Sequence, residues 1–482
     1  MNIRAVSHII SYLLGIIGIA LGLSLMVSFG ADDPLSAKYG IGISCLITIV
    51  TAAIVWLFTR GSIELSRRDG FGIATFGWLA AATFGALPYV FSGVISGPIP
   101  AIFETMSGFT TTGASVLSNI ESIPRGILFW RAMTQFFGGM GVLVLCVAIL
   151  PFLKVAGMQI YRAEVPGPSK DRLTPRITAT AKLLWGAYLL FCLIETVMLR
   201  FGGMSWFNSW CHTCATMATG GFSTRSASIG AYDSVYLDIV IIVFMFIAGT
   251  NFILHLKLLS GKPFEYFKNS EFRFYIFFWL TACLILTFNI WGNIYESFTE
   301  SLRAAFFQGT SIMTTTGFCT KDFDLWPETS RILLVLLMFV GGCAGSTGGG
   351  IKNIRVFVAI KALFREIQLY MRPETVKHVK VDGKYLKDKV VLNICAFLLI
   401  FVIVFAVGTL IMTAFTPDLA TAATSTIACL GNIGPGLSGV GATRNYAAIP
   451  QLGQLFLSLL MLLGRLELYT VLVIFTPAFW EK

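Results

Sequence analysis

The sequence predicts an all-α polytopic membrane protein: ten transmembrane helices, arranged as an N-terminal pair plus four repeats of span, re-entrant loop and span around a central pore. Composition, long apolar runs and a repeated glycine motif lead to this prediction. Of 482 residues, 56% are hydrophobic and only 12% are charged, whereas a typical soluble protein has about 25% charged residues. The composition therefore excludes soluble enzymes, nucleic-acid-binding proteins and secreted disulfide-rich domains.

Ten apolar runs are long enough to cross the hydrocarbon core of a bilayer, which takes about 20 helical residues. The first run resembles a secretory signal peptide, but its apolar core is longer than the roughly 7–15 residues of such a peptide, so we retain it as a span. The predicted spans are residues 8–30, 40–59, 71–92, 126–153, 178–200, 233–256, 272–293, 331–360, 389–415 and 450–478.

Basic residues gather in alternate loops between these spans. The two termini and the loops 60–70, 154–182, 257–273 and 352–389 together carry 25 of the 35 Lys and Arg residues. Because loops rich in Lys and Arg stay in the cytoplasm, both termini are predicted to be cytoplasmic. The loop 352–389 is basic enough to bind a soluble partner or anionic membrane lipid, and a role in topology alone would also account for its charge. No nucleic-acid partner is predicted.

Four further segments are too short to be spans, and each starts helix-like and ends in Gly, Thr and Ser. A full crossing by the first would move the basic loop 154–182 to the outside, so each is expected to enter and leave from the outer side. The segments are Ala101–Ser118, Ser205–Ser226, Leu302–Thr320 and Leu419–Ser438, and their aligned glycines Gly113, Gly221, Gly317 and Gly434 recur every 108, 96 and 117 residues.

This internal repeat defines the predicted domain organisation and its chemistry. Non-helical backbone at membrane depth must be buried in protein or line a water-filled cavity, although a single such loop could also serve close helix packing. Rings of carbonyl oxygens replace the water shell of a cation, and glycine allows the backbone angles that turn carbonyls toward an axis.

The same repeat sets the bounds of the predicted units. These are an N-terminal pair (1–70), pore repeats 1 (71–155), 2 (156–260) and 3 with an intramembrane gate loop (261–362), and a cytoplasmic linker with pore repeat 4 (363–482).

The eighth span contains six glycines between Gly341 and Gly350. Each glycine costs about 1 kcal/mol of helix propensity relative to alanine, so the middle of the span is predicted to unwind beneath the loops and to act as a gate. The alternative is a close-packed helix with Gly341 and Gly345 on one face. A phosphate-binding loop does not fit, because Lys352 comes one residue late and Asn353 replaces Ser or Thr.

Arg465 is an ionisable residue inside the tenth span, where a charge is costly unless it faces protein or water. Glu467 lies two residues away and so does not share its helix face. Arg465 is predicted to face the conduit, and a salt bridge to another span is the alternative. Cys211 and Cys214 have metal or redox spacing, but no second pair follows them. We therefore predict no metal or redox site at these two cysteines, and we predict that the protein is not an enzyme.

Several motifs, spread over nearly the whole chain, resemble those of a known protein family. The fourfold repeat, the additional N-terminal spans, Phe137–Gly141, Gly341–Gly350 and Gly464–Glu467 resemble the TrkH family, the membrane subunit of the bacterial Trk potassium uptake system. The resemblance implies an inner-membrane homodimer with one potassium-selective pore per chain. It also implies a cytosolic regulatory subunit that binds nucleotides, while this chain binds none.

The resemblance also assigns the site residues. For the potassium selectivity filter these are Thr111, Thr112, Gly113, Thr219, Gly220, Gly221, Thr315, Thr316, Gly317, Asn432, Ile433 and Gly434. For the gate they are Gly341, Gly342, Gly345, Ser346, Thr347, Gly348, Gly349, Gly350 and Arg465. The fourth loop departs most from the threonine pattern, so its carbonyl placement is the least determined.

Two other functions stay open at this stage. One is an ion-coupled secondary transporter or symporter; a transporter that holds an organic substrate at the midplane would have inverted repeats, and the parallel repeats here disfavour that form. The other is a pore with weak discrimination between potassium and sodium. An integral membrane enzyme is disfavoured, because His212 and His255 stand alone without a second ligand or base at a suitable spacing.

Overall fold

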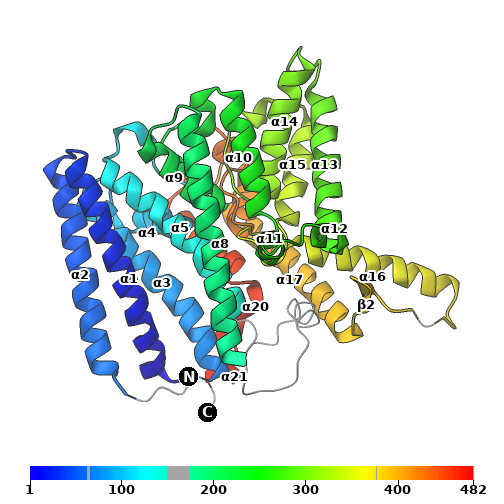
Figure 1. The fold of residues 1–482 in the computed structure, drawn as a ribbon, viewed down its shortest axis with the longest axis horizontal. Helices are drawn as coiled ribbons and strands as arrows, with labels where there is room; N and C mark the ends of the chain where they lie inside the picture. Colours follow the sequence, from blue (N-terminus) through cyan, green and yellow to red (C-terminus); the bar gives the residue numbers. More distant parts are fainter. Residues whose placement is uncertain (62–65, 149–172, 376, 481–482) are drawn as a thin grey trace.

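The computed structural model describes residues 1–61, 66–148, 173–375 and 377–480, and within these ranges it is predominantly helical. Helices α1 (Ile3–Gly30) and α2 (Leu35–Thr59) form an antiparallel pair at one edge of the molecule (Figure 1). The Asp33 side chain accepts hydrogen bonds from the backbone N–H groups of Arg125 (3.0 Å) and Gly126 (2.7 Å), which attaches this pair to the start of α5. The predicted N-terminal pair is therefore present and lies beside the rest of the bundle.

Four units of long helix, short helix and long helix follow. The first comprises α3 (Arg67–Phe91), α4 (Pro98–Phe109) and α5 (Arg125–Ala148), and the second α8 (Leu173–Phe201), α9 (Trp206–Met217), α10 (Val235–Ala248) and α11 (Phe252–Leu259). The third comprises α13 (Ser270–Ile290), α14 (Phe298–Met313), α15 (Glu328–Val340) and α16 (Asn353–Met371), preceded by α12 (Glu265–Lys268). The fourth comprises α17 (Asp388–Met412), α18 (Leu419–Leu430), α19 (Gln451–Arg465) and α20 (Leu468–Leu472), followed by α21 (Pro477–Trp480).

Six of the described helices are long and apolar enough to cross a membrane, or eight if each bent pair counts as one span. The bent pairs are α10 with α11, at 102°, and α19 with the segment Leu468–Phe475, at 114°. The other two predicted spans correspond to α5 and to α15 with α16. The multispan helical fold is thus confirmed, while residues 149–153 of the fourth predicted span lie outside the described residues.

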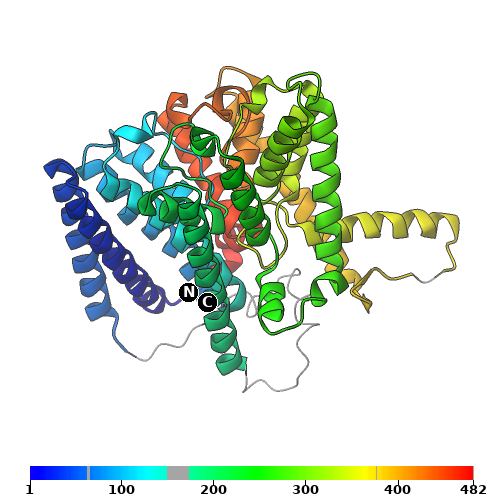
Figure 2. The same cartoon turned by 45° about the horizontal axis from the view of Figure 1, so that its top comes forward.

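One predicted span needs correction. The expected interruption after Val340 is present, but α16 then leaves the bundle and projects sideways (Figure 1), so residues 353–360 do not continue the span. Figure 2 shows the same arrangement from a second direction, with α1 and α2 at one edge and α16 at the other. The short strands β1 (Lys380–Val381) and β2 (Lys384–Tyr385) pair antiparallel after α16.

Both ends of the described chain lie on the same side of the molecule, at the start of α1 and at α21 (Figure 1). Large apolar side chains on the outer helices are exposed, among them Ile19 at 65%, Leu46 at 64% and Leu410 at 72%. Exposed side chains of this size are expected where lipid tails rather than water contact the protein. A dense group of buried polar residues, including Thr110–Thr112 and Thr314–Thr316, lies instead at the ends of the four short helices.

Candidate functional site

The four short helices α4, α9, α14 and α18 end in the same backbone geometry. Each is followed one residue after its cap by a residue with positive φ: Thr111 at 52°, Thr219 at 53°, Thr315 at 62° and Asn432 at 55°. The next N–H then bonds to a carbonyl five residues back, always at 2.8 Å: Thr112 to Ser107, Gly220 to Ala215, Thr316 to Ser311 and Ile433 to Ala428.

This pattern of bonds is a Schellman motif, the common ending of a helix in which a residue adopts the left-handed conformation. Glycine normally occupies that position, and for a β-branched residue such as threonine the conformation is strained. Three of the four loops nevertheless place threonine there. Strain that recurs at equivalent positions is typical of functional sites.

The glycine two residues further on closes the four loops into a ring. A Cβ atom on Gly113 would lie 2.2 Å from the carbonyl oxygen of Gly220, and one on Gly221 would lie 2.1 Å from that of Thr316. In the same way, a Cβ atom on Gly317 would lie 2.0 Å from the Ile433 carbonyl oxygen, and one on Gly434 would lie 2.6 Å from that of Thr112. Each glycine therefore faces the carbonyl that precedes the next glycine, and the fourth loop returns to the first.

The ring brings together all twelve residues of the predicted filter, which come from four loops about a hundred residues apart. Their threonine, asparagine and isoleucine side chains are at most 1% exposed. The fourth loop, with Asn432 and Ile433 in place of threonines, keeps the same backbone geometry as the other three. That these residues select potassium stays a prediction.

The segments that leave the ring are also joined in cyclic order. Glu121 accepts a hydrogen bond from the Ser226 N–H (2.8 Å), and Gly230 N–H donates to the Cys319 carbonyl (3.1 Å). Asp324 accepts from the Ser438 N–H (3.0 Å), and burial raises the pKa of this carboxyl above its ordinary value. The fourth connection runs from the Tyr446 N–H to the Ser115 carbonyl at 2.8 Å.

A cavity of about 160 Å³ lies beside the ring, among the segments that leave its loops, and is lined by all four ring glycines. Three arginines contribute to its wall: Arg131, Arg225 and Arg444. The Arg131 guanidinium is buried and forms an ion pair with Glu104 at 2.7 Å. Glu104 in turn accepts the Val116 N–H at 2.9 Å, so this pair supports the exit of the first loop.

The glycine-rich segment after α15 is non-helical from Gly341 to Lys352 and lies directly beneath the ring. Gly349 N–H donates to the Thr315 hydroxyl (2.6 Å), and Gly350 N–H donates to the Gly431 carbonyl (2.9 Å). The Thr347 hydroxyl donates to the carbonyl of Met217, the last residue of α9, at 2.9 Å. The predicted unwinding is therefore present, and the segment touches the ends of three short helices.

Arg465 joins this segment to two spans. Its Nη1 donates to the Thr347 carbonyl at 2.7 Å and its Nη2 to the Gly138 carbonyl of α5 at 3.0 Å. Glu467, which the sequence predicted not to pair with Arg465, forms an ion pair with Arg355 of α16 at 2.7 Å. Arg465, the last residue of α19, thus holds the glycine-rich segment, and Glu467, two residues later, holds its continuation in α16.

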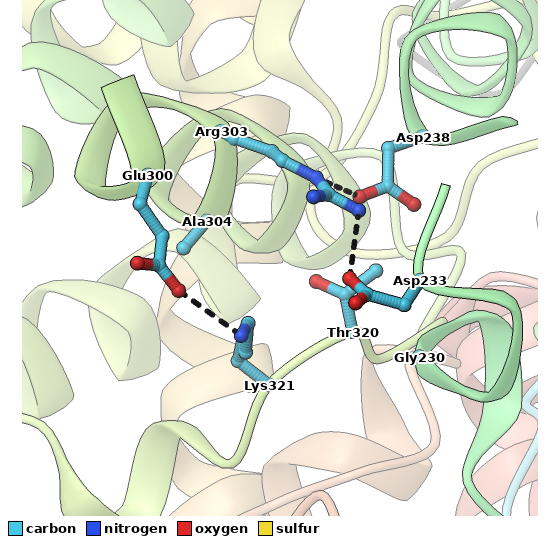
Figure 3. Close-up of a pocket in the computed structure, with 8 residues that line it drawn as sticks. All are labelled: Gly230, Asp233, Asp238, Glu300, Arg303, Ala304, Thr320 and Lys321. Atoms are coloured by element: carbon cyan, nitrogen blue, oxygen red, sulfur yellow. Dashed lines mark hydrogen bonds and ion pairs between the residues drawn. The ribbon is translucent and has the colours of Figure 1, made fainter. Parts of the chain in front are cut away.

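A charged cavity of about 210 Å³ beside the third loop was not predicted from the sequence (Figure 3). Arg303 of α14 pairs with Asp238 of α10 at 2.6 Å and with Asp233 at 3.3 Å, while Lys321 pairs with Glu300 at 3.2 Å. Asp238 lies within an apolar stretch of the sequence and Arg303 lies at the start of one. These charged residues are the signal from which the cavity could have been predicted. These pairs hold the third short helix against its neighbour and lie apart from the ring.

The remaining sequence candidates have ordinary structural roles. Cys211 and Cys214 are both buried and free of disulfides. The His212 ring contacts the Asn208 carbonyl (2.8 Å) and the Ser223 hydroxyl (2.9 Å), which fixes the exit of the second loop. Across the ranges that the structure describes, no group of three His, Cys, Asp or Glu residues could hold a metal ion.

Known proteins are similar to this chain in both sequence and structure. The model of a family described as TrkH, cation transport protein, matches residues 41–482. The Trk system potassium uptake protein TrkH of Salmonella typhimurium is 42% identical over 441 residues, covering 90% of this chain and 91% of its own, and that of Escherichia coli K12 is 39% identical over the full length of both. The crystal structure of the potassium transporter TrkH from Vibrio parahaemolyticus superposes with a TM-score of 0.92 at 34% identity, covering 100% of both chains.

Proposed function

The chain belongs to the TrkH family of cation transport proteins, and from that premise we propose that it takes up potassium ions across the bacterial inner membrane. The observation that carries the proposal is the closed ring formed by the carbonyls of Thr112, Gly220, Thr316 and Ile433 and the four glycines. A ring of carbonyl oxygens supplies the ligands that a cation loses when it sheds its water. Potassium is the cargo of this site and not a resident cofactor.

The short helices contribute to the same task. Each of α4, α9, α14 and α18 has its C-terminal end at the ring, and the C-terminal end of a helix carries the negative end of its macrodipole. Four such ends attract a cation, so no ring of carboxylates is needed. The twelve ring residues named above form the proposed filter.

The segment Gly341–Gly350 is the proposed gate. It occupies the cytoplasmic side of the ring and is held there by Thr315, Gly431 and Arg465 through hydrogen bonds of 2.6, 2.9 and 2.7 Å. Release of these bonds would clear the path beneath the ring. Gly342, Gly345, Ser346, Gly348 and their neighbours would then move as one connecting segment between α15 and α16.

We further propose that the protein works as a homodimer with a cytosolic nucleotide-binding regulatory subunit, and that both termini face the cytoplasm. The orientation is supported by the excess of basic residues in the loops on the terminal side and by the position of α1 and α21 at one side of the molecule, whereas the homodimer and the regulatory subunit rest on the family resemblance alone. The basic stretch 352–389, which includes α16, offers the regulatory subunit or anionic lipid a contact surface.

The test is flux of potassium, measured with the purified chain in liposomes, against the same gradient of sodium. We expect potassium flux to exceed sodium flux by at least tenfold and to proceed without a proton gradient. Equal flux of the two ions would overturn the proposed selectivity. Flux that appears only when a proton or sodium gradient is imposed would instead support a coupled symporter.

A further inference from the structure

The second loop of the ring lacks side chains that the first and third loops use to support themselves. In the first loop the hydroxyls of Thr110 and Thr112 are 2.8 Å apart, and in the third loop those of Thr314 and Thr316 are also 2.8 Å apart. The equivalent residues of the second loop are Ala218 and Gly220. Neither has a hydroxyl, and Gly220 has no side chain at all.

Gln135 of α5 occupies the vacant position. A Cβ atom built on Gly220 would lie 2.5 Å from Cδ of Gln135, so the glutamine fills the volume that a side chain would need. Its Nε2 donates to the Gly220 carbonyl at 2.6 Å, and its Oε1 accepts the Phe222 N–H at 3.1 Å. The glutamine side chain is completely buried.

These two hydrogen bonds bracket Gly221, the ring glycine of this loop, from both sides. A primary amide is suited to the task because it carries a donor and an acceptor on one rigid group. Two adjacent glycines have the largest conformational freedom of any dipeptide. Without an external constraint, Gly220 and Gly221 would be the most mobile part of the ring.

We propose that Gln135 is a positioning residue for the proposed filter, and that it sets the orientation of the Gly220 carbonyl on which ion selection depends. This inference rests on the proposed function. The Gly220 carbonyl has two lone pairs, of which one accepts the Gln135 amide and the other is left for the ion. The second loop therefore receives from a neighbouring span the support that the first and third loops build from their own threonines.

The competing explanation is that Gln135 only fills space in the core. Gln135→Leu and Gln135→Met keep most of the volume and remove both hydrogen bonds. If the positioning role holds, each variant should lose at least tenfold of the potassium preference over sodium in liposome flux, while it still inserts into the membrane and purifies as a folded protein. Having two variants of different shape keeps the test meaningful if one of them does not fold.

A matched control and a rescue separate the two explanations. Thr287→Val removes another fully buried hydrogen bond, from the Thr287 hydroxyl to the Cys283 carbonyl within α13 at 2.7 Å, and should leave ion preference unchanged. Gly220→Val alone should clash with Gln135 and reduce preference. Combined with Gln135→Ala, the same valine occupies the position that Ile433 has in the fourth loop and should restore preference at least in part.

The possible results test the positioning role of Gln135 and the proposed function separately. An unmodified protein that prefers potassium, with Gln135 variants that keep the full preference, would overturn the positioning role and leave the proposed function intact. An unmodified protein with no preference would overturn the proposed function itself. Loss of preference in Gln135→Leu and Gln135→Met, which keep the volume but remove both hydrogen bonds, supports the positioning role, and recovery in the Gly220→Val, Gln135→Ala double variant shows that a stiff side chain at position 220 can replace the amide.

Discussion

The ring of four loops and the segment Gly341–Gly350 are both glycine-rich, non-helical and surrounded by helices, yet they are held in different ways. Each ring loop is held by hydrogen bonds to its own short helix. One example is the bond from the Thr112 N–H to the Ser107 carbonyl, and each of the four loops has an equivalent bond of 2.8 Å. The gate segment has local bonds too, such as Ser346 N–H to the Cys343 carbonyl (3.2 Å) and Ile351 N–H to the Phe339 carbonyl (3.1 Å), but they do not repeat one pattern. Its other bonds reach Gly249, Gly431 and Arg465, which lie on other parts of the fold.

This difference suggests a division of roles. Local bonds that repeat in every loop make the ring rigid, as accurate placement of ligands around an ion requires. Bonds to distant partners can be exchanged together when those partners move, as a two-state element requires. The comparison predicts that changes in the ring alter which ion passes, and that changes in the gate segment alter how fast it passes.

The largest effect is expected from Gly317→Ser. Gly317 has a φ of 81°, and a Cβ would lie 2.0 Å from the Ile433 carbonyl oxygen, so the substitution must displace a ring carbonyl. We expect loss of most of the potassium preference, by tenfold or more, measured as the ratio of potassium to sodium flux. Gly93→Ser is the control, because Gly93 has a similar φ of 75° with no atom within 4 Å of the added Cβ. A similar loss in both variants would attribute the effect to backbone strain alone.

A smaller effect, on rate and not on selectivity, is expected from Arg465→Gln. The change removes the charged donor to the Thr347 carbonyl, and a hydrogen bond from a charged group contributes about 1.5–3 kcal/mol. If that bond favours the closed segment, basal potassium flux should rise about tenfold or more while the potassium-to-sodium ratio stays constant. Unchanged flux per molecule together with a clear fall in thermal stability would show that Arg465 is a structural residue and not part of the gate.

Sequence patterns predicted the parts of the molecule that follow local rules. Apolar runs located the helices, and the repeated glycines located all four loops of the ring, including the divergent loop at Asn432. The six glycines after Val340 predicted the unwound segment. Each of these features depends on residues that are close together in the chain.

Individual side-chain contacts between residues that are far apart in the chain were missed. Gln135 and Gly220 are 85 positions apart, and Arg355 and Glu467 are 112 apart. No spacing rule connects such residues in a single sequence. The sharp bend between α10 and α11, at 102°, was also missed. Its backbone is stabilised by contacts with the gate segment, including Phe252 N–H to the Gly345 carbonyl at 3.0 Å.

A third prediction tests whether the gate is coupled to α16 through the ion pair between Arg355 and Glu467. The Arg355 side chain is 6% exposed and that of Glu467 is 25% exposed, so Glu467→Gln leaves a largely buried guanidinium without its carboxylate. We expect a loss of roughly 1–3 kcal/mol of stability, seen as a lower melting temperature, and a change in basal flux smaller than that of Arg465→Gln. A double-mutant cycle with Arg355→Met should show coupling, and strict additivity would contradict the proposed connection.

The smallest effect is expected at Asp418, which caps the short helix α18 of the fourth loop. Asp418 accepts hydrogen bonds from the Thr421 N–H (2.7 Å) and hydroxyl (2.6 Å). The Thr421 side chain and backbone hydrogen bonds lower the pKa of this carboxyl below its ordinary value of 3.8. Because the folded-state pKa is lowered, the stabilisation is fully present above about pH 4 and is lost as the pH falls through the folded-state pKa. Asp418→Ala should therefore cost about 1 kcal/mol at pH 7.

This cost is small because Asp418 is exposed to solvent, which weakens the electrostatic part of the interaction. Asparagine also caps helices well, so Asp418→Asn should retain most of the stability and show no titration near pH 4. Thermal unfolding of the parent and both variants between pH 3 and pH 7 measures the effect. If Asp418→Ala changed ion preference as strongly as Gly317→Ser, the fourth ring loop would depend on its helix start as well as its helix end. The local bonds around Ile433 would then not be sufficient to fix the ring, and the contrast with the gate segment would be weaker than proposed.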